Sequence, residues 1–82
     1  MEFASSAEKY DRFMGRYARS VAPAFADAAG VVSGMMVLDV GCGPGGLTQE
    51  LARRVGAENV AAIDPAPQFA AACRERHPGA DV

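Results

Sequence analysis

Apolar positions near the N-terminus follow a helical period. Four aromatic or apolar residues recur at three- and four-residue intervals, on one face of a helix: Tyr10, Phe13, Met14 and Tyr17. A second, short helix is predicted over 23–29, because proline is tolerated in the first turn of a helix. Gly30 can end that helix in a left-handed conformation.

The middle of the chain has the order of elements that is typical of a parallel sheet. Residues 35–40 form a nearly unbroken apolar run, which suits a strand buried on both faces. A glycine cluster follows at 41–46, and an amphipathic helix of about ten residues then ends at Gly56. Residues 59–63 form a second apolar run that ends at Asp64, so the pattern predicts a βαβ unit.

The last segment repeats the helical pattern after Pro67, breaks it at 77–79, and begins a third strand at 80–82. The predicted fold class is therefore α/β, a partial Rossmann-like parallel sheet with N-terminal helices. It contains the first βαβ unit and the start of a third strand. We divide the chain into a helical segment, 1–34, that covers a ligand site, and a truncated first half of a Rossmann-like domain, 35–82.

Composition and charge exclude several classes of function. The 82 residues include 8 basic and 10 acidic ones, for a net charge of -2, so nothing indicates nucleic-acid binding. No apolar stretch is long enough to span a membrane, and no secretory signal is recognisable. Two cysteines make no disulfide framework, so we expect a cytoplasmic setting. The spacing of Cys73 and His77 is attributed to chance, and no metal site is expected.

The glycine cluster and the acid that follows it indicate a ligand site. Without a Cβ, the backbone of a glycine turn can come close to a ligand, and the next helix directs its free N–H groups to the same place. A ligand with a ribose fits at the carboxyl ends of such strands, where Asp64 can accept hydrogen bonds from both hydroxyls. The alternatives are a bare tight turn and a helix-capping carboxylate.

Two classes of ligand compete for this site. The spacing of Gly41, Gly43 and Gly46 also satisfies the fingerprint of a nicotinamide or flavin dinucleotide oxidoreductase. Pro44 argues against a pyrophosphate, because it has no N–H to donate. Asp39, beside the turn, suits a ligand with an ammonium group better than one with two phosphates.

Residues 37–45, Val-Leu-Asp-Val-Gly-Cys-Gly-Pro-Gly, resemble the first motif of class I S-adenosylmethionine-dependent methyltransferases. Residues 10–17 resemble the leading helix of the ubiquinone-biosynthesis-like branch of that family, which covers the cofactor. The resemblance implies a cofactor-binding set of eight residues: Asp39, Gly41, Gly43, Gly45, Asp64, Ala66, Arg16 and Tyr17. Thr48 and Gln68 are further contacts that it implies, whereas Cys42 is expected to be a small buried side chain.

The resemblance stops before the acceptor-binding half of the family's domain, and no residue here is predicted to be catalytic. We therefore expect an S-adenosylmethionine-binding part of a methyltransferase with a small-molecule acceptor, inactive as an isolated chain. Two alternatives remain at this stage. One is a dinucleotide-binding oxidoreductase fragment, and the other is a non-catalytic truncated module that self-associates through its open sheet edge.

Overall fold

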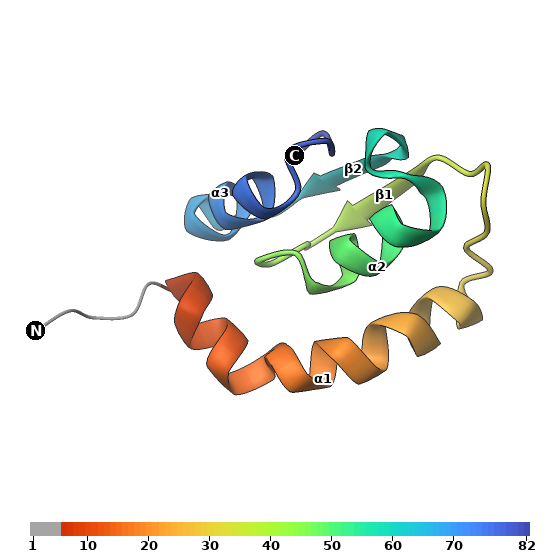
Figure 1. The fold of residues 1–82 in the computed structure, drawn as a ribbon. Coiled ribbons are helices and arrows are strands. Elements are labelled where there is room, and N and C mark those ends of the chain that lie inside the picture. The colour runs from red at the N-terminus through yellow and green to blue at the C-terminus, as the bar shows by residue number, and fades with distance from the viewer. Residues whose placement is uncertain (1–5) are drawn as a thin grey trace, which may run out of the picture.

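The computed structural model describes residues 6–82 (Figure 1). Its elements, in chain order, are a long helix, two short strands that flank a helix and a 3₁₀ turn, and a last helix: α1 (Ser6–Ala28), β1 (Val37–Val40), α2 (Gly46–Val55), η1 (Ala57–Asn59), β2 (Val60–Ile63) and α3 (Pro67–Arg76). The predicted βαβ unit and the helix after Pro67 are confirmed. The first strand is shorter than predicted and begins at Val37.

The sheet is parallel. β1 pairs with β2 so that Val37 lies opposite Val60, and Val40 lies opposite Ile63. Asp81 extends the sheet on the other side of β2, where its N–H donates to the carbonyl of Val60 at 3.0 Å. The predicted start of a third strand, and with it the partial Rossmann-like α/β fold, is confirmed.

The core lies between the sheet and the helices. One buried cluster joins the first helix, the second helix and the second strand: Ala26, Leu51, Val55 and Val60. A second cluster joins the glycine cluster, the second strand and the third helix: Cys42, Ala62 and Cys73. The first cluster is mostly aliphatic, whereas the second is made of small alanine and cysteine side chains.

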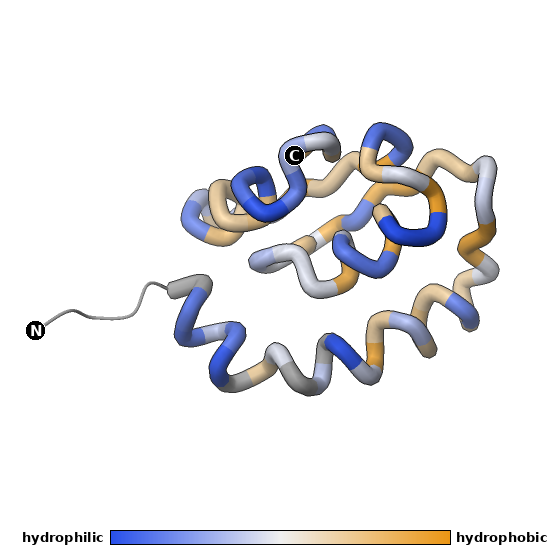
Figure 2. The backbone as a smooth tube through the Cα atoms, viewed as in Figure 1, coloured by the Kyte–Doolittle hydropathy of each residue, from blue (hydrophilic) through white to orange (hydrophobic). Residues whose placement is uncertain are grey.

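The other face of the sheet is open within residues 6–82. Leu38, Val40 and Ile63 are 59%, 70% and 53% exposed, respectively. They alternate with buried neighbours along each strand, because successive side chains of a strand point to opposite faces. Figure 2 shows hydrophobic colouring along these strands. The prediction that 35–40 is buried on both faces is therefore wrong for the described residues, since the core clusters occupy one face only.

The first helix runs without a break where two helices were predicted. Pro23 lies inside α1, and the helix curves rather than stops (Figure 1). A proline inside a helix removes one N–H donor and bends the helix. Gly30 ends the segment as predicted, at φ 73°, and the N–H of Val31 donates back to the carbonyl of Ala26 at 3.0 Å. None of the helices in residues 6–82 is long and apolar enough to cross a lipid bilayer.

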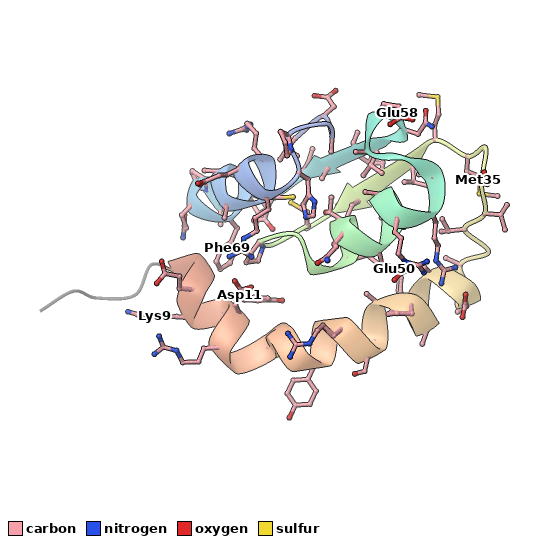
Figure 3. The ribbon with its side chains drawn as sticks, viewed as in Figure 1. Lys9, Asp11, Met35, Glu50, Glu58 and Phe69 are labelled. Carbon is pink, nitrogen blue, oxygen red and sulfur yellow. The ribbon has the colours of Figure 1, made fainter. Side chains whose placement is uncertain are left out.

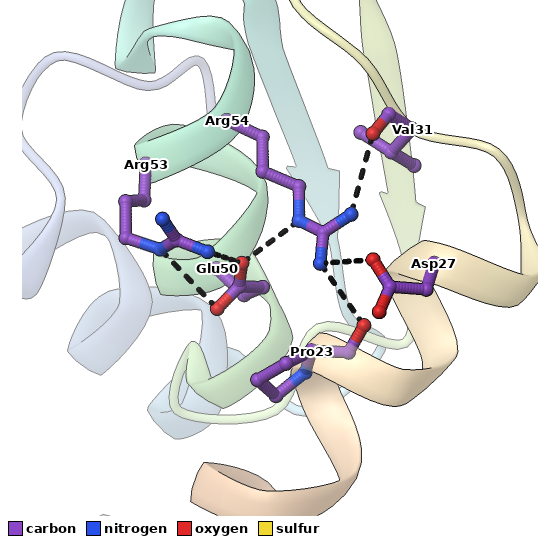
Figure 4. A network of polar contacts seen from close by, with 6 residues as sticks. All are labelled: Pro23, Asp27, Val31, Glu50, Arg53 and Arg54. Atoms are coloured by element: carbon purple, nitrogen blue, oxygen red, sulfur yellow. Dashed lines mark hydrogen bonds and ion pairs between the residues drawn. The ribbon is translucent and has the colours of Figure 1, made fainter.

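Arg54 joins the C-terminal part of α1 to α2 (Figure 4). Its guanidinium donates to Oε2 of Glu50 at 2.8 Å and pairs with Oδ1 of Asp27 at 2.7 Å. It also donates to the backbone carbonyls of Pro23 at 3.0 Å and Val31 at 3.3 Å. The hydrogen bonds with Glu50 and then Asp27 raise the pKa of Arg54 further above its ordinary value. One side chain thus fixes the position of α1 against the rest of the fold.

Candidate functional site

The glycine loop, residues 41–46, is anchored at the carboxyl end of the sheet. The N–H groups of Gly41 and Cys42 both donate to the carbonyl of Ile63, at 2.8 Å and 3.0 Å. Gly41 and Gly43 have φ angles of 74° and 55°, which side-chain-bearing residues adopt only with strain. The loop therefore turns back over the end of β2, where the predicted acid follows.

Asp64 lies against this loop and is held by two backbone groups. Its Oδ2 accepts the N–H of Gly43 at 2.8 Å, and its Oδ1 accepts the N–H of Ala66 at 2.8 Å. The proximity of Asp64 to the glycine turn is thus confirmed. The second bond is a local turn between Asp64 and Ala66 just before α3. It is not a helix cap, because the N-cap of α3 is Ala66, which has no side-chain capping bond.

The two backbone bonds leave acceptor capacity on Asp64. Each oxygen of an ionised carboxylate has two lone-pair sites, and here one site on each oxygen is used by backbone. Asp64 is half-buried, so part of the residue faces solvent. A fixed carboxylate with one acceptor site free on each oxygen matches a ligand that presents two adjacent hydroxyl donors.

Asp39 lies below the loop and inside the protein. It is 5% exposed, and its Oδ2 accepts the hydroxyl of Thr48 at 2.7 Å. The thiol of Cys73 donates in turn to that hydroxyl oxygen at 3.6 Å. This buried chain joins β1, α2 and α3. Thr48 is fully buried and its hydroxyl donates to Asp39, so the expected contact of Thr48 with a ligand is not supported.

Cys42 belongs to the structure of the loop. It is buried beside Cys73, and the two cysteines do not form a disulfide. Burial, followed by the hydrogen bond with Cys73, raises the pKa of the Cys42 thiol to about 12. A thiol that stays protonated at neutral pH is a poor nucleophile. The expectation that Cys42 is a small buried side chain is confirmed.

Tyr10 of α1 covers the glycine loop and was not predicted as a site residue. A methyl group built on Gly43 would lie 3.9 Å from Cζ of Tyr10. The ring meets Phe69 of α3 edge to face, with centroids 5.4 Å apart. The sequence places Tyr10 on a helical face, but only the tertiary structure brings that face to residue 43.

The other predicted site residues differ in how exposed they are. Ala66 is half-buried and Gln68 is exposed on the first turn of α3. Tyr17 is 48% exposed on α1, about two turns beyond Tyr10. The side chain of Arg16 lies outside the described residues. The structure therefore brings Gly41, Gly43, Asp64 and Ala66 together and leaves Tyr17 at a distance along the helix.

The end of α3 contacts the other side of the glycine loop. Nε2 of His77 lies 3.1 Å from the carbonyl oxygen of Gly45, and Nη1 of Arg76 donates to the carbonyl of Pro44 at 3.4 Å. Arg76 also pairs with Asp11 of α1, and this ion pair raises the pKa of the guanidinium. Figure 3 shows Asp11 and Phe69 on the parts of α1 and α3 that approach each other. Three elements thus meet at the loop.

A hollow of about 820 Å³ lies between α1 and the two later helices. Tyr10 and Arg19 line it from α1, and Gln49 and His77 line it from the opposite side. Residues 44–46 form part of its lining, whereas Asp64 is not among the described residues that line it.

Comparisons with known proteins agree with this geometry. The sequence profile of a family described as "Methyltransferase domain" matches residues 37–82. A trans-aconitate 2-methyltransferase of Mycobacterium ulcerans is 55% identical over 40 residues, and one of Mycobacterium tuberculosis is 50% identical over 40 residues. Each match covers 49% of this chain and 15% of the relative. Because the profile covers more than half of the chain, and the βαβ unit carries the family's glycine motif, the chain belongs to the class I S-adenosylmethionine-dependent methyltransferase family.

Proposed function

We propose that this chain binds S-adenosylmethionine at the carboxyl ends of β1 and β2, as part of a methyltransferase that acts on a small molecule. The observation that carries the proposal is the pair of 2.8 Å bonds that fix Asp64 against Gly43 and Ala66. They support a carboxylate set in advance to accept the two ribose hydroxyls of the cofactor. Charge-assisted bonds of this kind are the stronger class of hydrogen bond.

The glycine loop supports the same ligand. Gly41 has open space where a Cβ would stand, and its φ of 74° keeps the chain close to the strand ends. Gly43 presents its N–H to Asp64 rather than to a phosphate. In this proposal Gly41, Gly43 and Gly45 shape the methionine end of the site, and Ala66 borders the adenine.

Asp39 and α1 contribute in different ways. Asp39 acts from below by fixing β1 to α2 through Thr48, and so holds the loop between them. Tyr10 covers Gly43 from α1 and limits the access of water. Arg16 and Tyr17, on the same helix, remain proposed contacts for the carboxylate end of the cofactor.

When bound, S-adenosylmethionine would supply a methyl group on a sulfonium, which an acceptor takes by in-line displacement of S-adenosylhomocysteine. What this chain supplies is binding and orientation, which are a large part of catalysis for such a transfer. We assign no acceptor base among residues 6–82, and we propose that the 82 residues alone do not transfer methyl groups. The names of the curated relatives, methyltransferases of trans-aconitate, support a small-molecule acceptor.

The alternative of a dinucleotide is less well supported. Pro44 is buried within the loop and lacks an N–H, and the N–H of Gly45 is used by the carbonyl of Cys42 at 3.2 Å. Two donors that a pyrophosphate would need are therefore missing. Titration calorimetry with S-adenosylhomocysteine and with NADH tests the proposal. We expect saturable heat with the first ligand only, and heat with NADH alone would overturn the proposal.

The exposed face of the sheet favours a second candidate, self-association of the chain. Leu38, Val40 and Ile63 lie together on that face without cover in residues 6–82. Contiguous apolar surface of this kind is a common protein interface. Sedimentation velocity over a range of protein concentrations tests this candidate. A dimer that Leu38→Lys abolishes would support it, and a monomer at all concentrations would exclude it.

A further inference from the structure

We infer that His77 is a positioning residue, which holds the glycine loop in its ligand-binding conformation from the end of α3. Its effect on ligand affinity rests on the proposed function, whereas its contact with the loop does not. The contact is direct, because Nε2 of His77 lies 3.1 Å from the carbonyl oxygen of Gly45.

The imidazole also packs against the bare backbone of Gly45. A Cβ at that position would lie 2.9 Å from both Cδ2 and Nε2 of His77, and 3.2 Å from Sγ of Cys73. Real side chains do not approach this closely, so the ring occupies the space that the missing side chain leaves. Glycine at 45 and histidine at 77 are therefore complementary in shape.

The hydrogen bond fixes the orientation of one peptide group. The carbonyl of Gly45 also accepts the N–H of Gln49 at 3.0 Å, which is the first helical bond of α2. With both of its lone pairs used, this carbonyl cannot rotate without losing two bonds. A trans peptide is planar, so the N–H of Gly46 must point away from His77.

Arg76 holds the preceding peptide in the same way. Its Nη1 donates to the carbonyl of Pro44 at 3.4 Å and to Oδ1 of Asp11 at 3.1 Å. Two consecutive carbonyls of the loop thus face the end of α3. Of the two contacts, that of His77 is the shorter, and it acts at Gly45, the N-cap of α2.

The backbone of His77 is itself fixed on both sides. Its N–H donates to the carbonyl of Cys73 at 2.9 Å, which closes the last turn of α3. Its carbonyl accepts the N–H of Ala80 at 3.0 Å, at the start of the third strand. Pro78 follows at once and restricts the backbone of His77 further. The ring therefore has a rigid base from which to hold the loop.

The inference makes a prediction about the unliganded chain. Because a carbonyl can only accept, Nε2 of His77 must carry a proton, and the neutral ring must be the Nε2–H tautomer. Long-range ¹H–¹⁵N NMR of the wild-type chain at pH about 8, above the usual range of histidine, identifies the tautomer. The Nε2–H form is expected, and a predominant Nδ1–H form would overturn the inference without any ligand or variant.

Two substitutions then test the consequence for binding. His77→Leu removes the donor and keeps apolar bulk, whereas His77→Gln keeps a donor near the position of Nε2. We expect S-adenosylhomocysteine to bind about two- to tenfold more weakly to the leucine variant, the loss of one hydrogen bond. The glutamine variant should recover most of that affinity. Equal affinity of all three proteins, or equal loss in both variants, would contradict a positioning role.

The NMR measurement and the binding measurement test this inference and the proposed function separately. If the wild-type chain binds no S-adenosylhomocysteine, the proposed function fails, and the tautomer still decides whether His77 holds the loop. The backbone ¹⁵N shift of Gly46 gives a second reading in the unliganded variants. It should move in the leucine variant and stay near its wild-type value in the glutamine variant, and an unchanged shift in both would overturn the inference.

Discussion

The backbone N–H of Gly43 donates to Oδ2 of Asp64 at 2.8 Å, and this bond joins two residues that are 21 positions apart in the sequence. It connects the loop after the first strand with the end of the second strand. The carboxylate is consequently held in one orientation before any ligand arrives. Orientation in advance lowers the cost of binding, because the ligand does not have to order the side chain.

Asp64→Asn should weaken the binding of S-adenosylhomocysteine roughly 10- to 100-fold, since a charged acceptor of two hydroxyl bonds is lost. Titration calorimetry measures the change. Asp81→Asn is the matched control, because Asp81 is exposed and contributes to the sheet through its backbone. The control should bind like the wild type, and an Asp64→Asn variant that also does so would refute the ribose role.

Gly41→Ala and Gly45→Ala separate backbone strain from a steric clash. Both residues have positive φ, so each alanine should cost about 1–2 kcal/mol of unfolding free energy. Only Gly45 lacks room for a methyl group, and its clash with His77 should add roughly 1–3 kcal/mol. Urea denaturation gives both values. Equal losses would show that the ring of His77 moves away without cost.

Glu50 should make the stability of the chain depend on acid pH. Hydrogen bonds from Arg53 and then Arg54 lower the pKa of Glu50 below its ordinary value of 4.5. The unfolded chain therefore binds more protons than the folded chain in this range, and stability rises with pH. The contribution is fully present above pH 4.5 and is lost as the pH falls through the lowered value.

The test compares the thermal midpoints of wild type and Glu50→Gln at several pH values. At about pH 6 the wild type should be the more stable protein, and the difference should shrink as the acid range is entered. A difference that is constant with pH would show that the ionisation of Glu50 does not contribute.

Arg54→Ala should lower the thermal midpoint clearly more than Arg53→Ala. Both arginines bind Glu50, but the side chain of Arg54 is 16% exposed and that of Arg53 is 68% exposed. Arg54 also pairs with Asp27 and donates to two carbonyls near the end of α1, so its loss leaves these part-buried carbonyls without the side-chain donor. Equal midpoints of the two variants would contradict the role of Arg54 in fixing α1.

Both cysteines should react slowly with a thiol reagent in the native chain. The rise in the pKa of Cys42 from 9.0 to about 12 reduces its thiolate fraction on the order of a thousandfold. Ellman's reagent at pH about 8 should modify the thiols at the rate of unfolding, and at once in denaturant. Rapid modification of the folded chain would show that the glycine loop opens far more readily than its bonds indicate.

The sequence predicts those parts of the fold that local patterns determine. The glycine at 56 ends α2, the apolar run before Asp64 forms β2, and Gly30 terminates the first helical segment, all as the pattern indicates. The proximity of Asp64 to the glycine loop follows as well, because parallel strands bring their carboxyl ends to one edge. The division into 1–34 and 35–82 stays a prediction.

Other features depend on contacts that no local pattern carries. Pro23 bends α1 instead of ending it, because the bonds from Arg54 and the packing of Ala26 stabilise the longer helix. The partner of Asp39 is a hydroxyl on α2, which becomes evident only once α2 packs on β1. Likewise, His77 looks like a helix end in the sequence, and its contact with Gly45 is tertiary.

The central claim, that Asp64 binds the ribose of S-adenosylmethionine, is tested most directly by a thermodynamic cycle. Wild type and Asp64→Asn are each titrated with S-adenosylhomocysteine and with its 2′-deoxy analogue. Loss of the 2′-hydroxyl should weaken binding to the wild type about tenfold and should matter little to the variant, because the two groups are then coupled. The same loss in both proteins would place the hydroxyl away from Asp64 and contradict the account.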